Sequence, residues 1–339
     1  MKILQIVNPV IPFPPATIGG TERVVQYLVD DLVSRGHEVT LMGHNDSVAP
    51  AGAKFIPTGT YLDQEKTFSK IGRHLVLNRY DVIHNHGRLL YFLPQVWSRT
   101  RKVHTFHMAD LETRSFSRFL RLRPRNFTFS PCAAWIQEKY KHLSGHWQYV
   151  YNGLPKDAYS FNVHPPANDA PLVIICRIGE GKGVTDAIEI AQKTGRKLII
   201  AGKVGDYPHE KEWFAQKIKK YCDGLNIRFV GEVSDAEKQL LLENAAGLLM
   251  LSAGSEAFNL TMIEANACGC PVLTYDRYFG PDFIKPGING FIGSTQQDLI
   301  GAVSRLASID RAGCRRDFEE NYTAQRMTAN YLKLYHSTV

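Results

Sequence analysis

The fold class is decided by MKILQIVNPVIPFPPATIGGTERVVQYLVDDLVSRGHEVTLM, residues 1–42. KILQIV at 2–7 is a short apolar run typical of a buried strand. Residues 21–34 carry apolar side chains at the spacing of one helix face, and Gly36 stands where a C-terminal cap belongs. HEVTLM at 37–42 is the next strand. A buried strand, a helix and a second buried strand predict a parallel sheet covered on both faces.

The same alternation continues along the chain. In the first half, further strands are predicted at 81–84, 102–106, 127–130 and 148–151. In the second half, they are predicted at 172–176, 197–202, 226–231, 247–251 and 271–275. The sequence therefore predicts an α/β protein with two doubly wound, Rossmann-like domains.

Domain boundaries follow from composition. Residues 156–171 are rich in proline and polar side chains without a period, which is typical of a linker. We expect an N-terminal domain at 1–155, a second domain at 172–315 and a closing helix at 316–339. Ligands of open α/β sheets bind outside the carboxyl ends of the strands, so we expect a ligand cleft between the two domains.

Composition limits the classes of function. The 339 residues are 44% hydrophobic and 22% charged, which argues against disorder. No apolar run approaches the roughly 18 residues of a membrane-spanning helix. The net charge of +7 indicates anionic partners. The six cysteines are scattered without a CxxC pair, which favours a reducing, cytoplasmic location.

The strongest chemical signal is SAGSEAFNLTMIEANACGCPVLTYD, residues 252–276. A helix is expected from Leu260, and free N–H groups at its start, around Phe258 and Asn259, can hold phosphate oxygens. Glu256 and Glu264 would repel a phosphate but accept hydrogen bonds from sugar hydroxyls. Such a site suits a nucleotide sugar. From the residues alone, two solvated glutamates at a helix end are the alternative.

Two cations and a histidine belong to the same chemistry. Arg177 and Lys182 follow the first strand of the second domain, where they can neutralise a departing diphosphate; a solvated loop pair is the alternative. His107 follows a strand and could bind a sugar hydroxyl or position the sugar through its carbonyl, although a partly buried polar group is the plain alternative. His84 and His86 have no third ligand placed by sequence, so a metal site is not expected.

Several motifs together resemble one enzyme family. Residues 252–276, with Gly269 and Pro271, resemble the E-x7-E signature of the family 4 retaining glycosyltransferases, which have the GT-B fold. Further stretches resemble the same family in the same order: Gly19-Gly20-Thr21-Glu22, VHTFHM with His107, Asn152-Gly153, CRIGEGKG at 176–183 and Asn289-Gly290-Phe291. The chain looks most like a compact subgroup that includes antibiotic-pathway glycosyltransferases. The resemblance implies a closing helix that crosses back to the first domain.

The resemblance also implies a reaction. A hexosyl group would pass from a nucleotide diphosphate sugar, most commonly a UDP-sugar, to an acceptor hydroxyl with retained configuration. The enzyme would need no metal and no cofactor beyond this co-substrate, and would act in glycan, cell-envelope or glycoconjugate biosynthesis on a small-molecule or lipid-linked saccharide.

The resemblance assigns roles to particular residues. The expected catalytic residues are His107, Glu256, Arg177 and Lys182. The expected donor-binding residues are Gly19, Gly20, Arg177, Lys182, Gly202, Gly231, Glu256, Phe258, Asn259, Leu260 and Glu264. The backbone near Gly202 and Gly231 would read the base. The family usually has glycine where Asn259 stands, so a narrower donor pocket is expected.

Other functions remain open at this point. An enzyme alternative is a nucleotide-sugar epimerase or a phosphorylase on the same fold, although no motif for lysine-bound pyridoxal is present. A non-enzyme alternative is a silent GT-B-like binding protein. The basic segment, residues 113–126, interleaves arginines with aromatics and could contact an anionic membrane; a solvated helix face is the alternative. No nucleic-acid module is present, so no nucleic acid is expected.

Overall fold

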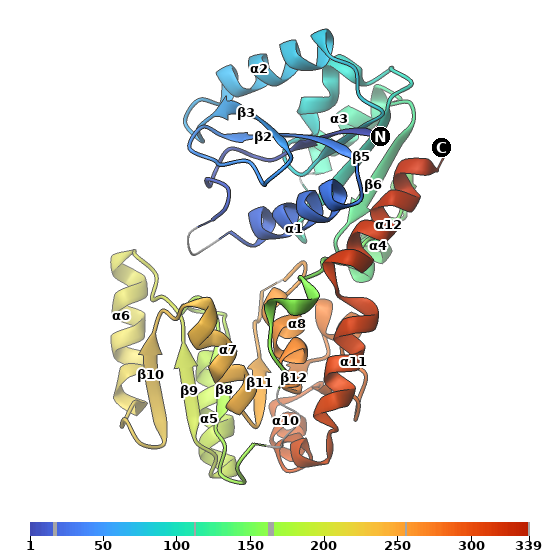
Figure 1. The fold of residues 1–339 in the computed structure, drawn as a ribbon. Coiled ribbons are helices and arrows are strands. Elements are labelled where there is room, and N and C mark those ends of the chain that lie inside the picture. Colours follow the sequence, from blue (N-terminus) through green and yellow to red (C-terminus); the bar gives the residue numbers. More distant parts are fainter. Residues whose placement is uncertain (16–18, 112, 162–165, 255, 338–339) are drawn as a thin grey trace. The chain divides into compact units, whose positions relative to one another are not determined.

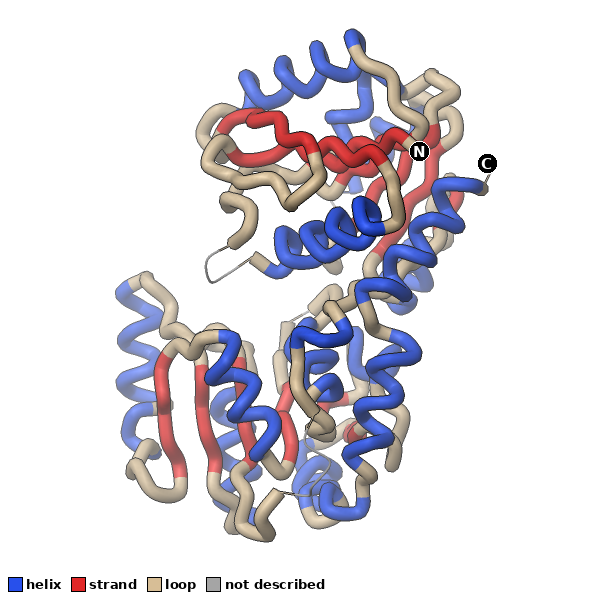
Figure 2. Tube along the Cα trace, viewed as in Figure 1, coloured by secondary structure: helices blue, strands red, loops and turns tan. Residues whose placement is uncertain are grey.

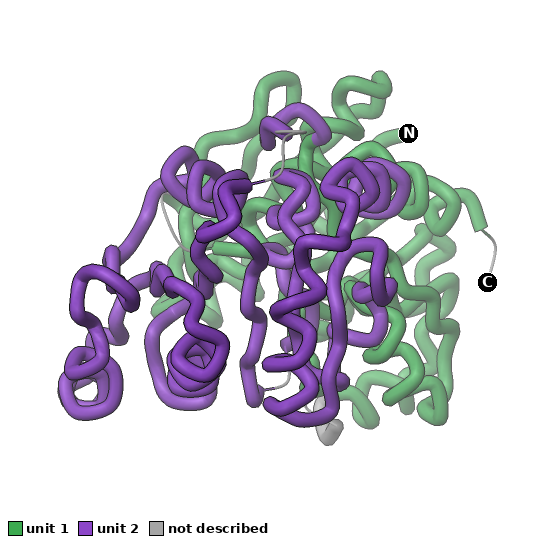
Figure 3. Tube along the Cα trace, turned by 90° about the horizontal axis from the view of Figure 1, so that it is seen from below, with its two compact units in different colours: residues 1–155, 323–339 green, residues 156–322 purple. Residues whose placement is uncertain are grey.

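The computed structural model describes residues 1–15, 19–111, 113–161, 166–254 and 256–337 (Figure 1). They form two compact units, and the first combines Met1–Pro155 with Thr323–Val339. The second unit is Lys156–Tyr322, and Figure 3 colours the two separately. In each unit, helices lie on both faces of a sheet (Figure 2). The predicted α/β class with two doubly wound parallel sheets is confirmed.

Within the described residues, the first unit has a seven-stranded sheet whose paired strands are all parallel. The strand order is β3-β2-β1-β4-β5-β6-β7. The strands are β1 (Lys2–Ile6), β2 (Glu38–His44), β3 (Lys54–Gly59), β4 (Val82–Asn85), β5 (Arg101–Phe106), β6 (Phe127–Pro131) and β7 (His146–Trp147). The direction of winding reverses between β1 and β4, and ligands of such sheets bind at this switch point.

Helices cover both faces of this sheet. They are α1 (Gly20–Ser34), α2 (Gln64–Leu77), α3 (Thr113–Arg121), α4 (Ala134–Tyr140) and α12 (Ala324–His336), with the 3-10 helix η1 (Leu89–Gln95). Side chains of α2, η1 and α3 share an apolar core with Leu4 and Ile6 of β1. Helices α1 and α12 lie side by side on the opposite face (Figure 1). The apolar stripe predicted for 21–34 is the buried face of α1.

The end of the chain differs from the single helix expected at 316–339. Helix α11 (Arg311–Asn321) belongs to the second unit and ends before Thr323. The Thr323 hydroxyl accepts the N–H of Arg326 and so caps a new helix, α12, which joins the first unit. The return of the closing helix to the first domain is therefore confirmed, but it begins at Ala324.

The second unit has a six-stranded parallel sheet in the part of the chain that is described, in the order β10-β9-β8-β11-β12-β13. The strands are β8 (Leu172–Ile175), β9 (Leu198–Ala201), β10 (Ile227–Gly231), β11 (Gly247–Met250), β12 (Val272–Tyr275) and β13 (Gly290–Gly293). The helices are α5 (Val184–Thr194), α6 (Pro208–Lys217), α7 (Asp235–Asn244), α8 (Leu260–Ala267), α9 (Phe279–Phe283), α10 (Gln296–Val303) and α11, with the 3-10 helices η2 (Lys156–Ala158), η3 (Lys219–Tyr221) and η4 (Leu306–Ser308).

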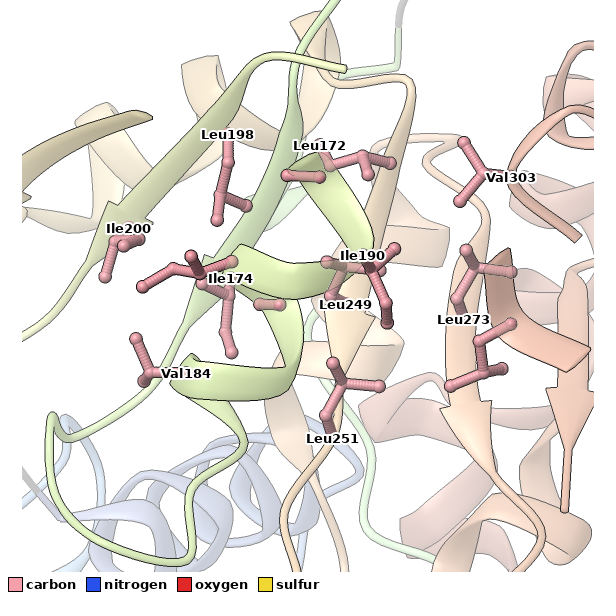
Figure 4. Close-up of a cluster of buried hydrophobic side chains, with 14 of the residues drawn as sticks. Leu172, Ile174, Val184, Ile190, Leu198, Ile200, Leu249, Leu251, Leu273 and Val303 are labelled. Carbon is pink, nitrogen blue, oxygen red and sulfur yellow. The ribbon is translucent and has the colours of Figure 1, made fainter. Parts of the chain in front are cut away.

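The core of the second unit fixes where its loops begin. Ile174 of β8, Ile190 of α5 and Leu249 of β11 are fully or almost fully buried in one apolar cluster (Figure 4). Strands β8 and β11 are neighbours at the switch point of this sheet. The loops that follow them, 176–183 and 251–259, therefore leave the sheet side by side at its carboxyl edge.

Some elements differ from the sequence prediction. Strands β3 and β13 were not predicted, because β3 is an edge strand that contains Pro57 and β13 is four residues long with a glycine at each end. The last strand of the first sheet is 146–147 rather than 148–151. Part of the expected linker is held in place, because Arg315 donates to the carbonyls of Lys156 and Tyr159 at 2.9 Å each.

Candidate functional site

Two loops are joined at the switch point of the second unit. The N–H of Ala253 donates to the carbonyl of Gly181 at 2.7 Å. Gly183 caps α5 with a φ of +78°, and a Cβ there would lie 2.5 Å from the Leu251 carbonyl oxygen. Only glycine fits such a backbone approach. Gly183 of CRIGEGKG thus lets the loop after β8 lie against the loop after β11.

This junction brings Lys182 and Glu256 together. Lys182 Nζ lies 2.6 Å from Glu256 Oε1, and the two side chains are 36% and 32% exposed. Ser252 Oγ donates to the same carboxylate oxygen at 3.1 Å. The pair is therefore ordered yet reachable from solvent, and an anion can approach the ammonium group.

Arg177 forms an ion pair outside the Lys182–Glu256 pair. Its guanidinium forms an ion pair with Glu210 of α6, and half of the Arg177 side chain is exposed. Glu210 also accepts the N–H of Tyr207 through Oε2 at 3.2 Å, as part of the capping box of α6. The structure thus places Arg177 beside α6 and does not place it against Glu256 or Glu264.

Glu264 is a buried member of the predicted site. It lies on α8, as predicted, and is 5% exposed. Its Oε1 accepts the Tyr159 hydroxyl at 2.8 Å and the Lys238 ammonium at 2.7 Å. Burial alone would lower the pKa of Lys238, but Glu264 and Asp235 raise it above its ordinary value. Glu264 is therefore a fixed carboxylate whose contacts with Tyr159 and Lys238 use the same oxygen.

The start of α8 carries an unpaired acceptor. Helix α8 begins at Leu260, and Asn259 is its N-cap without a side-chain capping bond. Asn259 Nδ2 lies 3.1 Å from the Met250 sulfur, while Oδ1 is buried without a hydrogen-bond partner. Asn259, Glu256 and Arg277 line a small cavity of about 20 Å³. Phe258 packs against Phe279 in a tilted arrangement, with ring centroids 4.2 Å apart.

Gly202 and Gly231, the two glycines expected to recognise the nucleotide base, have different surroundings. A Cβ on Gly202 would lie 1.7 Å from the Cys176 carbonyl oxygen, so β8 and β9 need this glycine for packing. The N–H of Gly202 donates to the Gly231 carbonyl at 2.7 Å, which places both glycines together at the carboxyl edge of the sheet. Gly231 has a φ of +77°, and a Cβ there would meet open space.

The first unit has its own cavity, of about 730 Å³, at the carboxyl edge of β1, β4 and β5. His86, His104 and His107 line it together with Glu22, and Phe106 and Met108 add apolar surface. Gly19 caps α1 with a φ of +147°, where a Cβ would lie 2.6 Å from Pro15 Cβ, and Gly20 is the first residue of α1. His107 follows β5, as predicted.

Burial sets the charge of this cavity. It lowers the pKa of His107 to about 4 and that of His104 to about 3, so both are neutral at pH 7. Burial raises the pKa of Glu22 above its ordinary value. In the described residues, no group of three or more His, Cys, Asp or Glu side chains is placed to hold a metal ion.

Four residues of these sites were missed from the sequence. Glu22 lies on a motif that was recognised, so its acidic side chain next to two glycines was a usable signal. Glu210, Lys238 and Arg277 gave no local signal, because they reach the site through contacts between distant segments.

Two doubly wound units with charged loops at a switch point have the architecture of the GT-B glycosyltransferases. The profile described as "Glycosyltransferase Family 4" matches residues 18–155, and that described as "Glycosyl transferases group 1" matches residues 156–324. The two matches span both units. The chain belongs to the family 4 glycosyltransferases, and the resemblance seen in its motifs is confirmed. Neither the epimerase nor the silent binding protein is favoured.

Related proteins and solved structures align with almost the whole chain. Glycogen synthase of Mycobacterium tuberculosis is 23% identical over 377 aligned residues, which cover 94% of this chain and 89% of that protein. The structure of AviGT4, a glycosyltransferase involved in avilamycin A biosynthesis, superposes with a TM-score of 0.75 at 19% identity and covers 98% and 96% of the two chains. Anabaena HepE in complex with UDP and glucose gives 0.77 at 15% identity and covers 99% and 100%.

Proposed function

We propose that the enzyme transfers a hexosyl group from a UDP-sugar to an acceptor hydroxyl with retention of configuration. The observation that carries this proposal is the Lys182–Glu256 pair at the switch point of the second unit, 2.6 Å apart and open to solvent. It offers a cation for a diphosphate and a carboxylate for sugar hydroxyls in one place. Support for uridine comes from the similar fold of HepE, which was solved with UDP and glucose.

Each predicted residue has a proposed part. Lys182, with Arg177 after the donor binds, neutralises the charge that develops on the departing diphosphate. Free N–H groups at the start of α8 hold phosphate oxygens, and Glu256 and Glu264 accept hydrogen bonds from the sugar and the ribose. For Arg177, this role requires that the diphosphate replaces Glu210 as its partner.

The first unit supplies the acceptor pocket and His107. The neutral imidazole of His107 exchanges hydrogen bonds with a sugar hydroxyl without adding a charge. In the transfer step, the bond between the anomeric carbon and the phosphate oxygen breaks as the bond to the acceptor oxygen forms on the same face. The acceptor proton passes to the leaving phosphate oxygen. This displacement needs neither a metal nor a covalent nucleophile.

A transfer assay tests the proposal. The full chain is incubated with a panel of UDP-hexoses and simple glycoside acceptors, and the product anomer is read by NMR. A product with the anomeric configuration of the donor supports the proposal. Inversion, or isomerisation of the donor without transfer, would overturn it. Glu256→Gln should abolish turnover, and Glu189→Gln, which changes an exposed carboxylate paired with Lys193, serves as the control.

The kind of acceptor and the location of the enzyme form a second proposal. We propose a small-molecule or lipid-linked saccharide acceptor and a cytoplasmic enzyme, supported by six cysteines that are all free thiols. No described helix has the length and apolar character of a membrane span. The basic segment would contact an anionic membrane through charge alone, because Phe116 and Phe119 are buried in the core.

Flotation with vesicles tests this contact. The side chains of 113–115 lie outside the described residues, whereas Arg118, Arg121 and Arg125 are exposed. The protein should float with phosphatidylglycerol vesicles at low salt, less so with phosphatidylcholine, and less when these three arginines are changed to glutamine. Equal flotation with both lipids, or no flotation, rules out the contact.

A further inference from the structure

A chain of side-chain hydrogen bonds runs from the last helix of the first unit to His107. Gln5 Nε2 on β1 donates to the Tyr335 hydroxyl on α12 at 3.2 Å. Gln5 Oε1 lies 2.8 Å from His86 Nε2, and His86 Nδ1 lies 3.0 Å from His107 Nε2. Gln5 is fully buried and His86 is 8% exposed, so bulk water does not compete for these bonds.

The position of each proton follows from the amide of Gln5. In this structure the amide oxygen faces His86 and only accepts, so His86 Nε2 carries the hydrogen. A neutral imidazole has one N–H, which leaves His86 Nδ1 as an acceptor. His107 Nε2 must then donate to His86, and His107 Nδ1 keeps a free lone pair. Burial lowers the pKa of His86 well below its ordinary value and that of His107 to about 4, so both rings are neutral at pH 7.

A second branch of hydrogen bonds is coupled to the orientation of that amide. The Tyr335 hydroxyl lies 2.7 Å from His84 Nδ1, and because it accepts from Gln5 Nε2, its own hydrogen is left for His84. His84 Nε2 lies 2.7 Å from Thr105 Oγ1, which lies 2.9 Å from the Tyr331 hydroxyl. A flipped Gln5 amide would therefore require every bond in both branches to reverse at once. The Gln5 amide and the tautomers of His84, His86 and His107 are therefore coupled, so that they change together or not at all.

We propose that Gln5 and His86 are positioning residues that hold His107 as its Nε2–H tautomer, so that Nδ1 accepts a hydrogen bond from a sugar hydroxyl. The identity of the ligand rests on the proposed function, but the tautomer does not. Helix α12, from the far end of the chain, is part of this device through Tyr335. The return of the last helix to the first unit therefore has a chemical consequence at the site.

The test is the ring-nitrogen NMR spectrum of the full chain labelled with ¹⁵N-histidine, with His107 assigned by its loss in His107→Gln. The expected result is an unprotonated Nδ1 and a protonated Nε2 on His107. Gln5→Met removes the oxygen that His86 needs, and a mixture of the two His107 tautomers is expected. Gln5→Glu, whose buried carboxyl is expected to stay protonated, keeps an oxygen acceptor for His86 and a donor for Tyr335, and the wild-type pattern should return.

Turnover is measured beside the spectra. We expect kcat to fall roughly tenfold in Gln5→Met, the loss of about one hydrogen bond, and to recover in Gln5→Glu with an unchanged donor KM. A protonated Nδ1 in the wild type overturns the proposal, even if no variant folds. Unchanged His107 spectra in Gln5→Met also overturn it. If the wild type transfers no sugar, the proposed function fails, and the tautomer still decides the role of Gln5 and His86.

Discussion

Replacing Lys182 by alanine separates a catalytic role from a structural one. The Lys182–Glu256 pair is about a third exposed on each side, so its loss should cost only ~0.5–1 kcal/mol of unfolding free energy. For a unit of this size, that is a fall in melting temperature of about 1–4 °C. A cation that stabilises charge only in the transition state contributes far more, and its loss should lower kcat by about 10²–10³-fold.

The assay is the initial rate of nucleoside diphosphate release together with thermal melts. Lys197→Ala is the matched control, because Lys197 forms a surface ion pair of 2.7 Å with Asp169 before β9, at the opposite edge of the same sheet. It should melt within a few degrees of the wild type and keep full activity. A Lys182→Ala enzyme that retains activity within about fivefold would refute the reasoning. So would a melting temperature that falls by more than about 10 °C, because the pair would then be structural.

Three further predictions concern the same loops and the partly buried His107. Gly183→Ala should lower the melting temperature and the activity together, because its Cβ would clash with Leu251 at a φ of +78°; circular dichroism melts and rates check this. Asn259→Gly should lower discrimination between UDP-hexoses, measured as the ratio of kcat/KM values, because it removes the side chain that lines the small cavity beside Glu256. Since the pKa of His107 falls from 6.5 to about 4 on folding, its contribution to stability is complete above pH 6.5 and is lost as the pH falls toward 4, by up to about 1.4 kcal/mol per pH unit. Urea unfolding of the wild type between pH 7.5 and 5 should show this loss, and His107→Gln should show a smaller one.

The parts of the fold that could be predicted were those with a strong local pattern. The segments 2–7 and 172–176 are short apolar runs, which are typical of buried strands. Helix α1 has an apolar stripe at helical spacing. Strand β3 gave no such signal, because it is a half-exposed edge strand that contains Pro57 and lacks a continuous apolar run. The break before α12 depends on one capping hydroxyl, that of Thr323, which is easily missed inside a long helical stretch.

The candidate site shows the same division. Lys182 and Glu256 were expected at one site because the family resemblance assigns both to the donor, and the structure places them in contact. The partners of Arg177 and Glu264 could not be predicted, because Glu210 and Lys238 are brought in by the packing of α6 and α7. Gln5 was missed because its position within a buried strand gives no sign that an amide there faces a histidine.

Binding calorimetry with a panel of nucleoside diphosphates tests the central claim most directly, because that claim is that the loops after β8 and β11 hold a diphosphate. The account predicts that at least one diphosphate binds the wild-type chain, that Lys182→Ala weakens it by about tenfold or more, and that Lys197→Ala leaves the affinity unchanged. Equal affinity in the wild type and Lys182→Ala, or no binding by any member of the panel, would contradict it.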